Sequence, residues 1–146
     1  MIRSTLTNNS GEEFSYISSR PIETGIPTFI FFHATGFNGQ TYWQLIEGLT
    51  KKFRESINFI SIDQRGHGLS TAEAKPEELE DWSIYVQDAL ELTDKLDSPL
   101  YCAGHSMGSI VAAKLASLRQ DKVKKLIMLE PVLYSPFECF KYKLMR

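Results

Sequence analysis

The sequence predicts an α/β protein: a three-layer, mostly parallel sheet with helices on both faces and an N-terminal β-hairpin. Short apolar runs that suit buried strands alternate with longer segments in which apolar residues recur every three or four positions. A glycine-containing loop follows three of these runs, and one loop contains Gly-x-Ser-x-Gly. The carboxyl ends of parallel strands carry the chemistry in such sheets, so we expect the three loops to meet at one edge.

The first two strands are expected at residues 2–7 and 13–18, on either side of the polar cluster Asn8-Asn9-Ser10-Gly11. Residues of these types favour turns, which indicates a hairpin. After a linker between Pro21 and Pro27, residues 28–32 form a continuous apolar run. Such a run is typical of a strand that is covered on both faces.

A helix is expected from Thr41, because apolar residues recur there at helical spacing: Trp43, Ile46, Leu49 and Phe53. Residues 57–62 predict the next strand, and the glycine-rich loop 63–70 follows it. A second helix is expected where one face is marked by Trp82, Tyr85, Val86, Ala89, Thr93 and Leu96, with Glu80 and Asp81 near its positive end.

The Gly-x-Ser-x-Gly pattern consists of Gly104, Ser106 and Gly108, between an expected strand at 98–103 and a helical pattern that runs to Leu118. A serine at a sharp strand-to-helix turn has a strained backbone that lifts its hydroxyl clear of the sheet. Side chains two residues away would collide within the turn, so glycine is required there. This context favours a nucleophile elbow over a serine that merely caps a helix.

A serine nucleophile needs a base, a group that orients the base, and two donors for the oxyanion. The N–H of Met107, the residue after the serine, is one expected donor, and the loop His33-Ala34-Thr35-Gly36 is the candidate for the other. The last strand is expected at residues 123–129, where it would form an open apolar edge.

Three blocks resemble the α/β-hydrolase fold superfamily, in particular esterase- and lipase-like members with a His-Gly loop and a cap: residues 33–37, 63–70 and 104–108. Their order and spacing also match, so the resemblance covers about residues 10–130. It implies that Thr35 supplies the second oxyanion donor, although Ala34 stands where the family usually has glycine. A serine rather than an aspartate at the elbow implies acyl transfer to water through an acyl-enzyme at Ser106.

The family's chain order places the catalytic acid and then the histidine after the serine, whereas His33, His67 and His105 all precede Ser106. We therefore expect the base to lie outside this sequence. Three carboxylates follow Ser106: Asp121, Glu130 and Glu138. Glu130 is the candidate acid because it ends the last expected strand on the catalytic side, with a structural or substrate-contacting role as the alternative.

We expect residues 1–130 to be a partial hydrolase core and residues 131–146 to begin a cap, so that the chain is a fragment. Alternative functions are a non-catalytic ligand-binding protein of this fold, or a carbon–carbon bond hydrolase or perhydrolase. Asp63 and Arg65 are interpreted first as residues that brace their loop. Phe37, Tyr42 and Trp43 could line an apolar acyl pocket or simply pack.

Composition excludes several other classes. A net charge of −2 over 146 residues, with mixed signs, gives no basic surface for nucleic acid. Two cysteines are too few for a disulfide framework, and Cys102 suits a core strand. The sequence contains no signal-peptide pattern, membrane span, metal cluster or cofactor motif, so we expect a cytoplasmic protein that acts on a small acyl substrate. The oligomeric state is not predicted.

Overall fold

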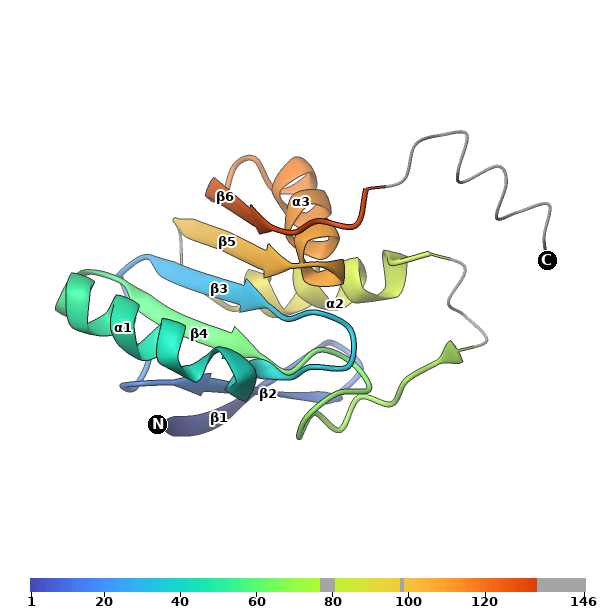
Figure 1. Ribbon diagram of the computed structural model, residues 1–146, viewed down its shortest axis with the longest axis horizontal. Coiled ribbons are helices and arrows are strands. Elements are labelled where there is room, and N and C mark those ends of the chain that lie inside the picture. The colour runs from blue at the N-terminus through green and yellow to red at the C-terminus, as the bar shows by residue number, and fades with distance from the viewer. Residues whose placement is uncertain (77–80, 98, 134–146) are drawn as a thin grey trace.

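The computed structural model describes residues 1–76, 81–97 and 99–133, and these residues contain one six-stranded sheet (Figure 1). The strands lie in the order β1-β2-β4-β3-β5-β6. Their bounds are β1 Ile2–Thr7, β2 Glu13–Ser18, β3 Thr28–Phe32, β4 Asn58–Ile62, β5 Leu100–His105 and β6 Val123–Leu129. The helices are η1 Gly39–Tyr42, α1 Trp43–Phe53, η2 Arg54–Ser56, α2 Ser83–Asp94 and α3 Met107–Leu118.

The strand directions confirm the predicted fold class. β1 and β2 form the N-terminal hairpin, and β2 also runs antiparallel to β4. β3 is parallel to both β4 and β5, and β5 is parallel to β6. The hairpin turn is held by the Asn8 side chain, whose Oδ1 accepts hydrogen bonds from the N–H groups of Ser10 and Glu12.

Several predicted boundaries differ from the structure, and two of the differences have a clear physical cause. The strand expected at 98–103 is β5, which begins at Leu100 and continues to His105 because Gly104 pairs with Phe32 and His105 pairs with Leu129. The helix expected from Thr41 begins two residues earlier as η1, because the Asn38 side chain accepts the Thr41 N–H. Glu80, Ser98 and the expected cap segment from residue 134 onward lie outside the described residues.

Helices cover both faces of the sheet, with α1 on one face and α2 and α3 on the other (Figure 1). Alternate residues of β3 face these two layers. Phe29 and Phe31 belong to the cluster that contains Ile46 of α1, whereas Ile30 and Phe32 belong to the cluster that contains α2 and α3 residues. A strand that is buried on both faces has no polar side, which explains its continuous apolar sequence.

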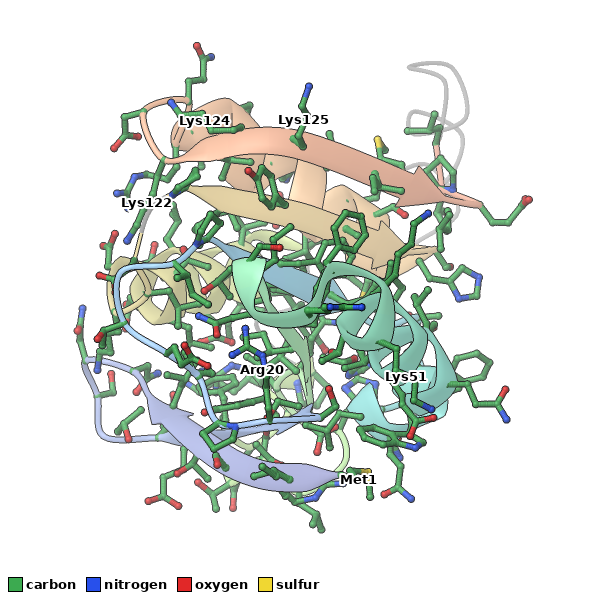
Figure 2. All side chains as sticks on the ribbon, turned by 90° about the vertical axis from the view of Figure 1, so that its left-hand side faces the viewer. Met1, Arg20, Lys51, Lys122, Lys124 and Lys125 are labelled. Carbon is green, nitrogen blue, oxygen red and sulfur yellow. The ribbon has the colours of Figure 1, made fainter. Side chains whose placement is uncertain are left out.

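β6 forms one edge of the sheet, as expected, and exposes the apolar side chains of Leu126, Ile127 and Leu129. Lys124 and Lys125 are also exposed on this strand, and the Lys125 side chain extends away from the sheet (Figure 2). Lysine on an edge strand opposes pairing with another chain. None of the helices in the described ranges is long and apolar enough to cross a membrane.

Arg65 lies at the centre of a buried charge network between the β1–β2 turn, α2 and the loop after β4. Its guanidinium donates two hydrogen bonds to Asp88 at 2.7 and 2.8 Å and two to Glu12 at 2.6 and 2.8 Å. A fifth donor bond reaches the carbonyl of Glu73. These bonds from Arg65 lower the pKa of the Glu12 carboxyl to about 2. The network braces the loop that Arg65 was expected to brace.

Replacing Arg65 with alanine should lower the free energy of unfolding by about 3–5 kcal/mol, because Asp88 would remain buried without its partner. Urea denaturation measures this change. Arg119 provides the control, because it pairs with exposed Asp94 and Asp121, so Arg119→Ala should cost at most about 1 kcal/mol. Equal losses in the two variants would contradict the assignment of a central role to Arg65.

Candidate functional site

Ser106 stands in a sharp turn between β5 and α3, with backbone angles φ 52° and ψ −118°. This region is unfavourable for a residue with a Cβ atom and costs of order 1–3 kcal/mol. The strand, the strained serine and the helix therefore follow one another as the motif predicts. Ser106 is half-buried, and its hydroxyl has no hydrogen-bond partner among the residues that the structure describes.

The two glycines of the motif are required by close backbone contacts. A Cβ atom on Gly104 would lie 2.1 Å from the carbonyl oxygen of Gly108, which is closer than atoms can approach. A Cβ atom on Gly108 would lie 2.2 Å from the carbonyl oxygen of Phe32 at the end of β3. Glycine thus allows the first turn of α3 to rest directly on two strand ends.

Hydrogen bonds to backbone carbonyls then fix the elbow to the ends of β5 and β6. The N–H of Ser106 donates to the carbonyl of Leu129 at 2.9 Å. The hydroxyl of Ser109, one turn into α3, donates to the carbonyls of Gly104 at 2.6 Å and Leu129 at 3.0 Å. The elbow is therefore held by β3, β5 and β6 together.

In the loop after β3, the backbone N–H groups on both sides of Thr35 donate hydrogen bonds. The N–H groups of Ala34, Gly36 and Phe37 donate to the Tyr42 hydroxyl, to His67 Nε2 and to the Ala34 carbonyl. The N–H of Thr35 has no acceptor within the described part of the chain, and Thr35 is exposed.

The second expected donor is equally uncommitted. The N–H of Met107 is the first of helix α3, where backbone donors have no partner within the helix. No other described residue accepts a hydrogen bond from it. The two predicted oxyanion donors, Thr35 and Met107, thus both have N–H groups without an acceptor among the described residues. Thr35 follows β3 and Met107 follows β5, so both lie near the carboxyl ends of these parallel strands.

His33 and His67 hold these loops with both ring nitrogens. His33 Nε2 accepts the N–H of Gln64 at 3.0 Å, so its Nδ1–H donates to the carbonyl of Ala34 at 2.8 Å. His67 Nε2 accepts the N–H of Gly36 at 3.2 Å, and its Nδ1–H donates to the carbonyl of Arg65. Burial lowers the pKa of His33 to about 4, so its ring is neutral near pH 7.

Asp63 joins the same loops to the hairpin. Its carboxylate accepts hydrogen bonds from the N–H of Gly39 at 2.7 Å, the N–H of Leu69 at 2.9 Å and the guanidinium of Arg3 at 3.0 Å. A Cβ atom on Gly68 would lie 2.3 Å from this carboxylate, which explains why glycine occurs at that position. Asp63 therefore braces its loop, as the sequence indicated.

His105 lies inside the elbow, and its Nδ1 is 2.8 Å from the hydroxyl of Tyr42. The Phe37 ring lies 6.1 Å from the His105 ring and 6.4 Å from the Tyr42 ring, centroid to centroid. Sequence reasoning placed Tyr42 only in a pocket wall or in packing. Nothing in the local pattern could indicate that Tyr42 contacts a residue 63 positions away.

Glu130 directly follows β6 and has a left-handed backbone, with φ 43°. Its side chain is exposed and has no ion pair or hydrogen bond to another described residue. Asp121 precedes β6, at the other end of this strand from Glu130, and pairs with Arg119. Glu138 lies outside the described residues. Among the described residues, no three His, Cys, Asp or Glu side chains are grouped to hold a metal ion.

We predict that Gly108→Ala lowers the free energy of unfolding by about 2 kcal/mol, because the new methyl group cannot coexist with the Phe32 carbonyl. Urea denaturation is the measurement. Gly48→Ala is the matched control, since a Cβ atom there meets nothing within 4 Å on α1. That variant should gain about 0.5–1 kcal/mol through helix propensity. A neutral Gly108→Ala would refute the close contact.

Acid should destabilise the protein through His33. Its pKa is depressed in the folded state, so the unfolded chain takes up the proton first and stability falls as pH drops below about 6.5. Between pH 7 and pH 5 the loss should be about 2 kcal/mol. Urea midpoints across this range should decline in the wild type and much less in His33→Gln. Equal declines of the urea midpoint in the wild type and in His33→Gln would show that another group causes the pH dependence.

Comparison with known proteins places the chain among α/β hydrolases. Residues 27–145 match the family described as "Serine aminopeptidase, S33". The (E)-2-((N-methylformamido)methylene)succinate hydrolase of Acinetobacter baylyi is 34% identical over 104 residues, which are 70% of this chain and 37% of that protein. Human monoglyceride lipase is 26% identical over 130 residues, which are 84% of this chain and 41% of the lipase.

Solved structures agree on the fold. A thioesterase domain from the curacin biosynthetic pathway superposes with a TM-score of 0.78 at 21% identity, covering 99% of this chain and 52% of that domain. A hydrolase from Pseudomonas aeruginosa superposes with a TM-score of 0.73 at 21% identity, covering 98% and 51%. The chain spans about a third to a half of the length of these proteins. With its fold, its elbow and its sequence match, the chain belongs to the S33 serine aminopeptidase family of α/β hydrolases.

Proposed function

We propose that this chain carries the nucleophile and the oxyanion hole of a serine hydrolase that cleaves a carboxylic ester or a related acyl substrate. The observation that carries the proposal is the strained Ser106: among the described residues, neither its hydroxyl nor the N–H of the next residue, Met107, has a hydrogen-bond partner. A serine held in this backbone conformation without a hydrogen-bond partner is of little use for packing. Strain that persists at one residue is commonly associated with a reactive site.

The reaction follows from these groups. Ser106 Oγ attacks the carbonyl carbon while a base removes its proton, and the carbonyl π electrons move onto the oxygen. The N–H groups of Thr35 and Met107 stabilise the resulting oxyanion. Collapse of the tetrahedral intermediate expels the alcohol or thiol, which takes up the proton, and leaves an acyl group on Ser106. Water then attacks this acyl-enzyme in the same way, releasing the acid and regenerating the serine.

The base is proposed to lie outside these 146 residues. Both ring nitrogens of His33 and of His67 are engaged within the loops, and the ring of His105 is held by Tyr42. Glu130 is the candidate for the carboxylate that orients the base, because it follows β6 beside the Leu129 carbonyl that anchors Ser106. In the same proposal, residues 1–130 form the core and residues from 131 lead into a cap.

The names of the relatives support acyl chemistry, but they do not agree on one substrate. They include a lipase, a protein phosphatase methylesterase from Debaryomyces hansenii and a succinate-derivative hydrolase. A mouse epoxide hydrolase is also similar. A serine alcohol needs a base before it attacks, and its oxyanion donors suit a carbonyl rather than an epoxide. Carbon–carbon bond hydrolysis and perhydrolysis would use the same carbonyl attack and remain alternatives that substrate screening separates.

A fluorophosphonate probe tests the proposal, because it phosphonylates an activated serine. The 146-residue chain should label slowly at Ser106, and added imidazole should accelerate labelling at about pH 8, where imidazole is a neutral base. Mass spectrometry of the digested protein identifies the modified residue and its rate of modification.

Two variants make this experiment decisive. Ser106→Ala should abolish the imidazole-dependent labelling, whereas Ser117→Ala, at the far end of α3, should label at the wild-type rate. Modification of other serines at similar rates, or a rate that does not respond to imidazole, would exclude a missing-base serine hydrolase. It would favour a binding protein that only retains the fold.

A further inference from the structure

We infer that Tyr42 is a positioning residue, whose hydroxyl couples the loop that carries the oxyanion donor Thr35 to the nucleophile elbow. The inference rests on the proposed function for its catalytic consequence. The observation that carries it is a pair of hydrogen bonds at one oxygen. Tyr42 Oη accepts the N–H of Ala34 at 3.3 Å and lies 2.8 Å from Nδ1 of His105.

One phenol oxygen can make both of these bonds. It accepts the N–H of Ala34 with one lone pair and bonds His105 Nδ1 through its hydrogen or its second lone pair, according to the tautomer of the imidazole. Burial raises the pKa of Tyr42, so the phenol keeps its hydrogen near neutral pH. One hydroxyl thus connects the residue before Thr35 with the residue before Ser106.

Tyr42 is itself held from several directions, which a positioning residue requires. It ends η1, whose first residue Gly39 donates its N–H to Asp63 and would clash with the Ser61 carbonyl if it carried a Cβ atom. The Tyr42 ring lies 4.3 Å from the Phe31 ring on β3, centroid to centroid. The Tyr42 ring is therefore held in place, and its hydroxyl lies between the loop that contains Ala34 and the elbow that contains His105.

Catalytic consequences should follow from small displacements. Two donors stabilise an oxyanion only where both lie near 3 Å from its position. The Met107 donor is fixed by α3, whereas the Thr35 donor belongs to a loop, and its N–H has no acceptor among the described residues. Losing the Tyr42 hydroxyl would free Ala34 and shift Thr35 relative to Met107. The loss should therefore affect bond formation more than initial substrate binding.

Tyr42→Phe tests this role while preserving the ring. Amide hydrogen exchange, followed by NMR, should become about 5-fold faster at Ala34, the change expected for loss of one hydrogen bond. Amides of the β1–β2 hairpin serve as the internal reference for global stability. The maximal rate of fluorophosphonate labelling at Ser106, measured with imidazole, should fall by a similar factor, while the half-saturating probe concentration stays unchanged.

Tyr101→Phe is the matched control, because Tyr101 packs in the same layer on β5 and its hydroxyl has no hydrogen bond to a described residue. It should change neither readout. His105→Asn retains a hydrogen-bonding group near the position of Nδ1 and should stay close to the wild type. His105→Leu removes that group and should resemble Tyr42→Phe.

The outcomes separate this inference from the proposed function. Unchanged exchange at Ala34 in Tyr42→Phe, or an equal change in Tyr101→Phe, would overturn the positioning role even if Ser106 labels normally. Faster exchange in Tyr42→Phe alone supports the coupling even where the wild-type chain fails to label, a failure that counts against the serine hydrolase. Slower labelling with a raised half-saturating concentration would assign Tyr42 to binding and contradict positioning.

Discussion

The close approach of α3 to the end of β3 is the contact on which the site depends. Gly108 lies so near the Phe32 and His33 carbonyls that no side chain could be accommodated. This contact sets where the helix begins, and therefore where Ser106 must turn. The strain at Ser106 is offset by hydrogen bonds on both sides, from the Ser106 N–H to the Leu129 carbonyl and from the Ser109 hydroxyl to the Gly104 carbonyl. The serine proposed as the nucleophile is thus presented by a rigid backbone rather than by a flexible loop.

Around this contact, the loops are braced by side chains of types that often serve as catalytic groups. His33, His67 and Asp63 use their polar atoms to bind backbone amides and carbonyls of neighbouring loops. Because most loop amides are engaged in this way, the free amide of Thr35 is a specific feature. Preorganised donors of this kind stabilise developing charge without having to reorganise during the reaction.

The buried charged side chains of this protein hold separate parts of the fold together. Arg65 directs five donors to Glu12, Asp88 and a carbonyl, and so joins the hairpin, α2 and the loop after β4. Such a pair is specific because each buried group needs its partner. The loops at the site are held by the Asp63 carboxylate and by His33, whose depressed pKa makes it a neutral hydrogen-bonding brace near pH 7. Acid should consequently weaken the loop scaffold before it affects the Glu12 pair.

Local patterns were sufficient to predict most of the fold, and the elbow in particular. The apolar run at 28–32, the helical spacing before Phe53 and the glycines around Ser106 each reflect constraints that act within a few residues. Bounds shifted where long-range pairing extended β5 to His105. Tertiary structure alone decided which distant groups meet: Arg65 with Asp88 and Glu12, Arg3 with Asp63, and Tyr42 with His105. The physical reason is that periodicity reports which face of an element is buried, whereas a hydrogen-bond partner is chosen by how separate elements pack.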